Sequence, residues 1–275
     1  PSFMVESTTH ASPAEAKSTL SADWVAFRTI VIKEIRRFLR IWPQTLVPPA
    51  ISMVLYFLIF GTFIGSRVGQ MGGLDYMAFI VPGLIMMSVI TNAYSNVASS
   101  FYSTKFQRSI ETMLVAPIPN GVILAGFVAG GVARGLCVGA IVTIMAGFFV
   151  DFTIHSFALT VGMILMTAVL FSLGGFINAV FADKFDDISI IPAFVLTPLT
   201  YLGGVFYSLD LLPDFWRTVS YFNPIVYMVS SFRYGIFGVS GDVPVYLSVA
   251  AIGGFVVLFW TISLVLLNRG TGIRA

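Results

Sequence analysis

Residues 105–119 read KFQRSIETMLVAPIP, a short polar stretch that separates two long apolar segments of the chain. In a helix, its apolar side chains would share one face at i, i+4, i+7 and i+8: Phe106, Ile110, Met113 and Leu114. Thr104 and Gln107 fit a capping box at the start, and Pro117, which has no backbone N–H, predicts the end. The stretch therefore predicts an amphipathic helix over residues 105–116, at a membrane surface and suited to docking another protein.

The whole chain has the composition of an integral membrane protein. Of its 275 residues, 57% are hydrophobic and 10% are charged, and the mean hydropathy is +0.92. Soluble domains carry about 25% charged residues, so the composition excludes an ordinary soluble enzyme. The single cysteine, Cys137, lies in an apolar segment, and neither His10 nor His155 has a second ligand at metal-binding spacing. We therefore expect no disulfide framework and no metal site.

Six segments are long and apolar enough to cross a bilayer, which needs about 20 residues per helix. They are residues 44–65, 77–102, 121–150, 157–181, 188–206 and 245–267. With the N-terminus in the cytoplasm, eleven of the 15 Lys and Arg residues fall on the cytoplasmic side, three fall outside and Arg134 lies within a segment. The positive-inside rule then predicts an all-α, multi-pass protein with six transmembrane helices and both termini in the cytoplasm.

Two features precede the first of these segments. Residues 1–22 are polar and lack the apolar core of a signal peptide, so they predict a disordered tail before one transmembrane domain at 23–275. Residues 23–42 predict a second amphipathic helix. Its apolar face holds Trp24, Phe27, Val31, Ile35, Phe38 and Trp42, and its basic face holds Lys33, Arg36, Arg37 and Arg40. Such a helix lies in the interface with its basic face toward anionic lipids, either as a simple anchor or as an elbow around a partner subunit.

The third apolar segment contains several glycines and one charged residue. Its glycines form three overlapping Gly-xxx-Gly spacings: Gly126, Gly130, Gly131, Gly135 and Gly139. This spacing lets helix backbones approach closely, so the segment is expected to pack inside a bundle. Arg134 lies among the glycines, and we favour a side chain that snorkels to the cytoplasmic interface over a buried functional charge.

The second segment carries uncharged polar side chains on roughly one helical face: Ser88, Asn92, Asn96 and Ser99. A polar face within lipid must look inward, toward other helices or toward a water-filled path. Hydrogen bonding between helices and a substrate pathway both remain open. The weaker candidates for a facing wall are Thr197, Thr200 and Tyr201.

After the fifth segment, residues 207–237 are aromatic and apolar but broken by prolines. The pieces 214–222 and 224–237 are too short to span a bilayer. They predict re-entrant or interfacial helices on the outer side, where non-helical backbone must be buried in protein or line a cavity.

Several catalytic motifs are absent from the sequence. There is no Gly-x-x-x-x-Gly-Lys-Ser/Thr phosphate loop, no Gly-x-Ser-x-Gly elbow and no His-Glu-x-x-His helix. We therefore predict a protein that is not an enzyme and that binds no cofactor itself, and we expect no nucleic-acid partner.

Four stretches together carry a family resemblance: EIRRFLRIWPQTLVPP, FQRSIETMLVAPIP, LTPLTYLGGVFYSLDLLPDFW and NPIVYMVSSFRYG. Over nearly the whole chain after residue 22, the sequence resembles the permease subunits of ABC-2-type exporters. The motif positions are Arg108, Glu111, Leu114 and Pro117 in one stretch, and Asn223, Pro224, Tyr227 and Arg233 in another.

The resemblance implies a bacterial inner-membrane permease that pairs with a second copy of itself. Two copies of a separate ATP-binding cassette ATPase, which holds ATP and Mg, would dock on it. Residues 105–116 would be the coupling helix, 23–42 the connecting helix and 207–237 the outer re-entrant helices. The family moves drugs, lipids and lipid-linked polysaccharides, so the resemblance does not identify the substrate of this chain.

The resulting hypothesis is an export permease for an amphipathic or lipid-like substrate. A lipid-linked polysaccharide exporter is an alternative within the same class. An uncoupled channel or membrane scaffold is the alternative from another class, and an intramembrane enzyme ranks third because the catalytic motifs are missing.

Overall fold

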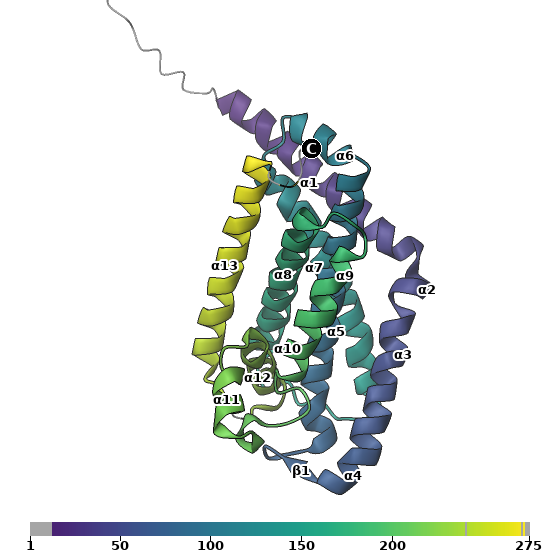
Figure 1. The fold of residues 1–275 in the computed structure, drawn as a ribbon, viewed down its shortest axis with the longest axis vertical. Helices are drawn as coiled ribbons and strands as arrows, with labels where there is room; N and C mark the ends of the chain where they lie inside the picture. Colours follow the sequence, from purple (N-terminus) through teal and green to yellow (C-terminus); the bar gives the residue numbers. More distant parts are fainter. Residues whose placement is uncertain (1–12, 240, 271, 273–275) are drawn as a thin grey trace, which may run out of the picture.

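The computed structural model describes residues 13–239, 241–270 and 272, with side chains from residue 20 onward, and these residues form an elongated bundle of helices (Figure 1). Helix α1 (Pro13–Arg40) crosses one end of the bundle obliquely. It includes residues 13–22, for which the sequence predicted a disordered tail, because Ala, Glu, Lys and Leu extend the amphipathic helix toward the N-terminus. The rest of the predicted tail, residues 1–12, lies outside the described residues.

Five of the described helical segments are long and apolar enough to cross a membrane. They are Trp42–Val68, Tyr76–Phe106, Asn120–Ala146, Phe157–Phe181 and Val245–Arg269. The first is built from α2 (Trp42–Thr45), α3 (Val47–Tyr56), the π-helix η1 (Phe57–Ile64) and α4 (Gly65–Val68). The others are α5 (Tyr76–Phe106), α7 (Asn120–Ala146), α8 (Phe157–Phe181) and α13 (Val245–Arg269).

The remaining predicted span, residues 188–206, forms a shorter apolar helix, Asp187–Tyr201. It consists of three five-residue pieces, α9 (Asp187–Ile191), the π-helical η2 (Pro192–Leu196) and α10 (Thr197–Tyr201). We call it the split helix. It ends early because the chain turns at Gly203 and Gly204, where Gly204 adopts a positive φ of 70°. The described residues therefore contain five apolar helices long enough to span a membrane and this shorter one, in place of the six predicted spans.

Helix α5 forms the centre of the bundle, packed against α7 and α8, while α13 and α3 lie along opposite sides (Figure 1). In an 18-residue apolar stretch of α5, 78% of the residues are buried, against 11% in such a stretch of α13. The glycines of α7 account for the close approach, as the sequence predicted. An added Cβ on Gly131 or Gly135 would lie within 3.0 Å of α5 atoms, and one on Gly126 or Gly130 within 2.6 Å of α1 atoms.

The connecting elements gather at the two ends of the bundle. One end carries α1 and α6 (Ser109–Val115), and we call it the α6 end. The other, the α11 end, carries the antiparallel strands β1 (Gln70–Met71) and β2 (Leu74–Asp75). It also carries η3 (Leu209–Leu211), α11 (Asp214–Ser220) and α12 (Pro224–Phe237). Two short helices thus occupy the region where the sequence predicted them.

Candidate functional site

The predicted docking helix at 105–116 is two pieces with a sharp corner between them. Helix α5 continues through Phe106, and α6 begins only at Ser109. Between them, Arg108 adopts a φ of 56°, the single positive φ at a non-glycine residue in the described chain. The expected capping box is wrong, because the Thr104 hydroxyl donates to the Ser100 carbonyl of α5, 2.9 Å away. The predicted end is confirmed: α6 stops at Val115, before Pro117.

The corner buries one side and exposes the other. Ile110 is fully buried, and Met113 and Leu114 pack against the core, as an amphipathic helix should. Phe106, which was expected on the same face, is 75% exposed because it belongs to α5. The exposed surface, which we call the exposed corner, consists of Phe106, Arg108, Glu111 and Val115. No ion pair joins Arg108 to Glu111 in the described structure, so both charges are free to meet a partner.

The face of α1 that packs against the bundle is not the apolar face that the sequence predicted. Ile30, Glu34 and Phe38 are the buried positions, at 6%, 0% and 3% exposure, whereas Trp24 and Trp42 are 63% and 55% exposed. Phe27 is only partly buried. Gly126 and Gly130 of α7 select this face, because their missing side chains leave room for Ile30 and Glu34. Hydrophobicity alone did not reveal it, since a glutamate lies at its centre.

Glu34 anchors a buried polar network that sequence reasoning missed. The Ser100 hydroxyl donates to Glu34 Oε1 over 2.6 Å, and Arg37 Nε lies 3.4 Å from Glu34 Oε2. Arg37 also donates to the carbonyl and side-chain oxygens of Asn96, both at 2.8 Å, and its other Nη donates to Ser99 at 3.4 Å. Of the predicted basic face, Arg37 thus turns into the bundle, while Arg36 and Arg40 are exposed. The i, i+3 spacing of Glu34 and Arg37 was the available signal.

Most side chains of the predicted polar face of α5 form hydrogen bonds within α5 itself. Ser88 and Asn92 are buried, and their side chains donate to carbonyls of α5 itself. Asn96 accepts from Arg37 of α1. The face that meets open space is the neighbouring one, where Thr91, Ser95 and Ser99 follow each other at intervals of four residues.

A cavity of about 430 Å³ lies between α5, α7 and the split helix, and we call it the polar cavity. Its polar lining comprises Ser95, Ser99, Arg134, Ser189 and Thr197. A small void of about 40 Å³ adjoins it, lined by Thr91, Thr200 and Tyr201 and sharing Pro192 and Thr197 with the larger cavity. The structure thus brings Ser99 together with Thr197 of the predicted facing wall, whereas Thr200 and Tyr201 line the adjoining void with Thr91.

An aromatic contact borders the small void, which Tyr201 lines. The hydroxyls of Tyr56 and Tyr201 lie 3.1 Å apart, which joins the first span to the split helix. Phe206 packs beside both, with its ring centroid 5.9 Å from that of Tyr56 and 5.6 Å from that of Tyr201. The small void is therefore bounded at Tyr201 by a hydrogen-bonded aromatic contact.

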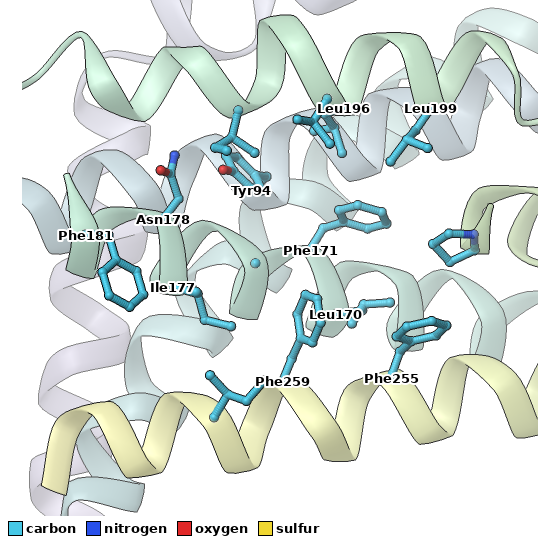
Figure 2. Close-up of a pocket in the computed structure, with 15 residues that line it drawn as sticks. Tyr94, Leu170, Phe171, Ile177, Asn178, Phe181, Leu196, Leu199, Phe255 and Phe259 are labelled. Atoms are coloured by element: carbon cyan, nitrogen blue, oxygen red, sulfur yellow. The ribbon is translucent and has the colours of Figure 1, made fainter. Parts of the chain in front are cut away.

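A second, larger space of about 520 Å³ lies on the other side of the split helix, and we call it the apolar groove. Figure 2 shows it lined by α13 (yellow, at the bottom), the split helix (green, at the top) and α8, whose ribbon runs between the two in this view. Its labelled apolar side chains are Leu170, Phe171, Ile177, Phe181, Leu196, Leu199, Phe255 and Phe259. Tyr94 and Asn178 are the polar members, close together toward the Phe181 end (Figure 2).

The residues of the predicted outer motif hold the α11 end together. Asn223 accepts from the N–H of Ile225 at the start of α12 and donates to the carbonyl of Leu199 over 2.6 Å. Pro224 occupies the first helical position, where a missing N–H costs nothing. Tyr227 donates to the carbonyl of Tyr221 over 2.7 Å.

Arg233 is the buried centre of this region, with 3% of its surface exposed. Its guanidinium donates to the carbonyls of Phe79 and Gly204, at 3.1 and 2.9 Å, and lies 3.8 Å from the ring centroid of Phe79. It therefore ties α12 to the start of α5 and to the turn that ends the split helix. These contacts give the residues of the outer motif a structural role, without requiring that they contact a substrate.

Comparison with known proteins gives a consistent result. The model of the ABC-2 type transporter family matches residues 25–237. The chain is 61% identical over 252 residues to the inner membrane transport permease YadH of Escherichia coli K12, covering 92% of this chain and 98% of that protein. It is 26% identical to nodulation protein J of Rhizobium leguminosarum bv. trifolii, over 78% of this chain and 82% of that one.

Proposed function

The chain belongs to the ABC-2 type transporter family, and from that premise we propose that it is the permease subunit of an exporter for an amphipathic substrate. The observation that carries the proposal is the polar cavity, which lies among helices long enough to cross a membrane. Its wall combines hydroxyls and a guanidinium with apolar side chains, as a path for an amphipathic molecule requires. A span that only anchors a protein needs no such cavity.

We assign the α6 end to the cytoplasm of a bacterium, because most Lys and Arg residues flank that end of the spans. The split helix is then the fifth of six membrane segments. At 1.5 Å per residue it is about 22 Å long, short of the roughly 30 Å of hydrocarbon, so the turn after Tyr201 lies within the outer leaflet. Helices α11 and α12 follow as the outer re-entrant pair.

Energy would come from a separate ATP-binding cassette ATPase that holds ATP and Mg, with two copies docked on a pair of these chains. The exposed corner offers that ATPase Phe106 and Val115 beside unpaired charges on Arg108 and Glu111. Arg37 connects α1 to the same helix, α5, that lines the polar cavity. Motion imposed at the α6 end would therefore reach the cavity through hydrogen-bonded helices.

Reversing the charge of Glu111 tests the coupling. The chain is purified with a candidate cassette ATPase from the same genome, and ATP hydrolysis is measured with and without it. We expect Glu111→Lys to remove at least nine-tenths of the permease-dependent hydrolysis while the size-exclusion profile and melting temperature stay unchanged. Asp151→Lys makes the same charge change at an exposed residue of the α7–α8 loop and should have no effect.

Two results would contradict the proposal. One is the absence of any complex between the chain and candidate ATPases. The other is full hydrolysis with Glu111→Lys, which would favour an uncoupled channel or scaffold.

A further inference from the structure

Arg134 is a charge without a counter-ion inside the bundle. It lies near the middle of α7, and the adjacent Gly131 and Gly135 contact Val89, Ala93 and Val97, near the middle of α5. Its guanidinium makes no hydrogen bond or ion pair with any described residue, and its Nε is buried without a partner. The sequence favoured a side chain that snorkels to the cytoplasmic interface, whereas this position near the middle of α7 supports the alternative of a charge held within the bundle. The backbone contacts made by the glycines hold Arg134 at this depth.

A second guanidinium strengthens the positive potential at this wall. Arg37 is bound to Asn96 and Ser99 of α5, close enough to Arg134 for electrostatic repulsion. Glu34, the acidic residue of this network, is already bound to Ser100 and Arg37 and is fully buried away from the cavity. Lys33 Nζ also lies 3.8 Å from Glu34 Oε1, so among these described groups three positive charges accompany one negative charge.

An unpaired charge at this depth in a membrane is costly, so the site calls for an anion. A guanidinium presents a planar fork of N–H donors that matches phosphate and carboxylate oxygens. Ser95 and Ser189 add hydroxyls to the same wall, whereas Phe185, Ile188 and Pro192 make another part of the lining apolar. The cavity therefore offers a cationic contact and an apolar contact to one ligand.

We propose that the polar cavity binds the anionic head group, phosphate or carboxylate, of an amphipathic molecule, with Arg134 as its ligand. The statement that this molecule is the transported one rests on the proposed function. The binding itself is a property of this chain and needs no ATPase. Arg134 is the contact residue, and Arg37 raises the positive potential beside it.

Radiolabelled dodecyl phosphate serves as the probe, and binding is measured on the full chain in phosphatidylcholine nanodiscs, which carry no net anionic lipid. We expect saturable binding that Arg134→Gln weakens about 10- to 100-fold, the range for loss of a charge-assisted contact. Arg134→Lys should retain part of the affinity. Arg67→Gln removes an equally positive but exposed side chain of α4 and should bind like the unchanged chain.

Ser95→Leu keeps Arg134 but fills the cavity, so it should also weaken binding and covers the case in which Arg134→Gln does not fold. Dodecyltrimethylammonium and inorganic phosphate should compete at least tenfold less well than unlabelled dodecyl phosphate. Equal binding by Arg134→Gln, or no saturable binding by the unchanged chain, would overturn the proposal. If inorganic phosphate competes as well as unlabelled dodecyl phosphate, the proposal that the ligand is amphipathic would be overturned. Because no ATPase is present, failure of the proposed coupling leaves these results intact.

Discussion

The two sides of the split helix carry spaces of similar size and opposite chemistry. The apolar groove, at about 520 Å³, is the larger, yet its walls are as apolar as the lipid chains around them, so it needs no specific ligand. The polar cavity, at about 430 Å³, contains an unpaired guanidinium that lipid cannot satisfy. Unsatisfied charge therefore identifies a site in a membrane protein better than volume does.

The split helix can separate these spaces because its two faces differ. Ile191, Val195 and Leu199 face the groove, whereas Ser189, Ala193 and Thr197 face the polar cavity. The π-helical piece η2 contributes residues to the lining of both spaces. Single π-helical turns of this kind are frequent at functional sites.

The largest expected effect comes from removing the support behind the polar cavity. Glu34→Ala leaves Arg37 without its carboxylate and Ser100 without its acceptor, which should cost about 3–5 kcal/mol of stability. Thermal unfolding in detergent measures it. The matched change beside the groove, Leu258→Ala on the half-exposed side of α13, should cost less than about 1.5 kcal/mol. Equal losses would show that Glu34 does not support the cavity.

A medium effect is expected from adding bulk to one face of the split helix at a time. Thr197→Leu enlarges a side chain in the polar cavity, and Val195→Leu enlarges one in the apolar groove, two residues away. We expect Thr197→Leu to weaken dodecyl phosphate binding at least fivefold and Val195→Leu to change it less than twofold. If both variants weaken binding alike, the two spaces are not independent.

The smallest effect tests whether the apolar groove has any polar function. The Tyr94 hydroxyl is buried and has no hydrogen-bond partner among the described residues, although Asn178 is near. Tyr94→Phe should therefore be neutral or stabilise the chain by up to about 1 kcal/mol. Tyr76 is similarly buried but donates to the Phe206 carbonyl at 3.0 Å, so Tyr76→Phe should cost about 1 kcal/mol. The melting temperatures of both variants test this expectation. A lower melting temperature for Tyr94→Phe would show that the Tyr94 hydroxyl does have a hydrogen-bond partner.

Sequence reasoning succeeded where one residue type has one physical consequence. Pro117 predicted the end of α6, and Asn223 with Pro224 marked the start of α12. The glycine spacing of α7 predicted its close packing. These signals are local, because a missing N–H or a missing Cβ acts on the backbone next to it.

It failed where the direction of a side chain depends on another helix. The pattern of α1 suggested a lipid-facing basic side, but glycines a hundred residues later turned Glu34 and Arg37 inward. On α5, the predicted face was Ser88, Asn92, Asn96 and Ser99, and of these Ser99 lines the polar cavity, while the other lining positions, Ser95 and Thr91, lie one residue before Asn96 and Asn92. A rotation of one residue cannot be read from periodicity when polar side chains cover two adjacent faces.

By itself, the sequence determined that this chain is a helical membrane protein with a polar stretch between two apolar segments, because hydrophobic runs, prolines and glycines act locally and without regard to neighbours. Only the tertiary structure decided that Arg134 is unpaired in a cavity, that Glu34 is paired and buried, and that the last predicted span before α11 is short. The energy of a charge depends on what surrounds it in space, and that environment is assembled from residues far apart in the chain.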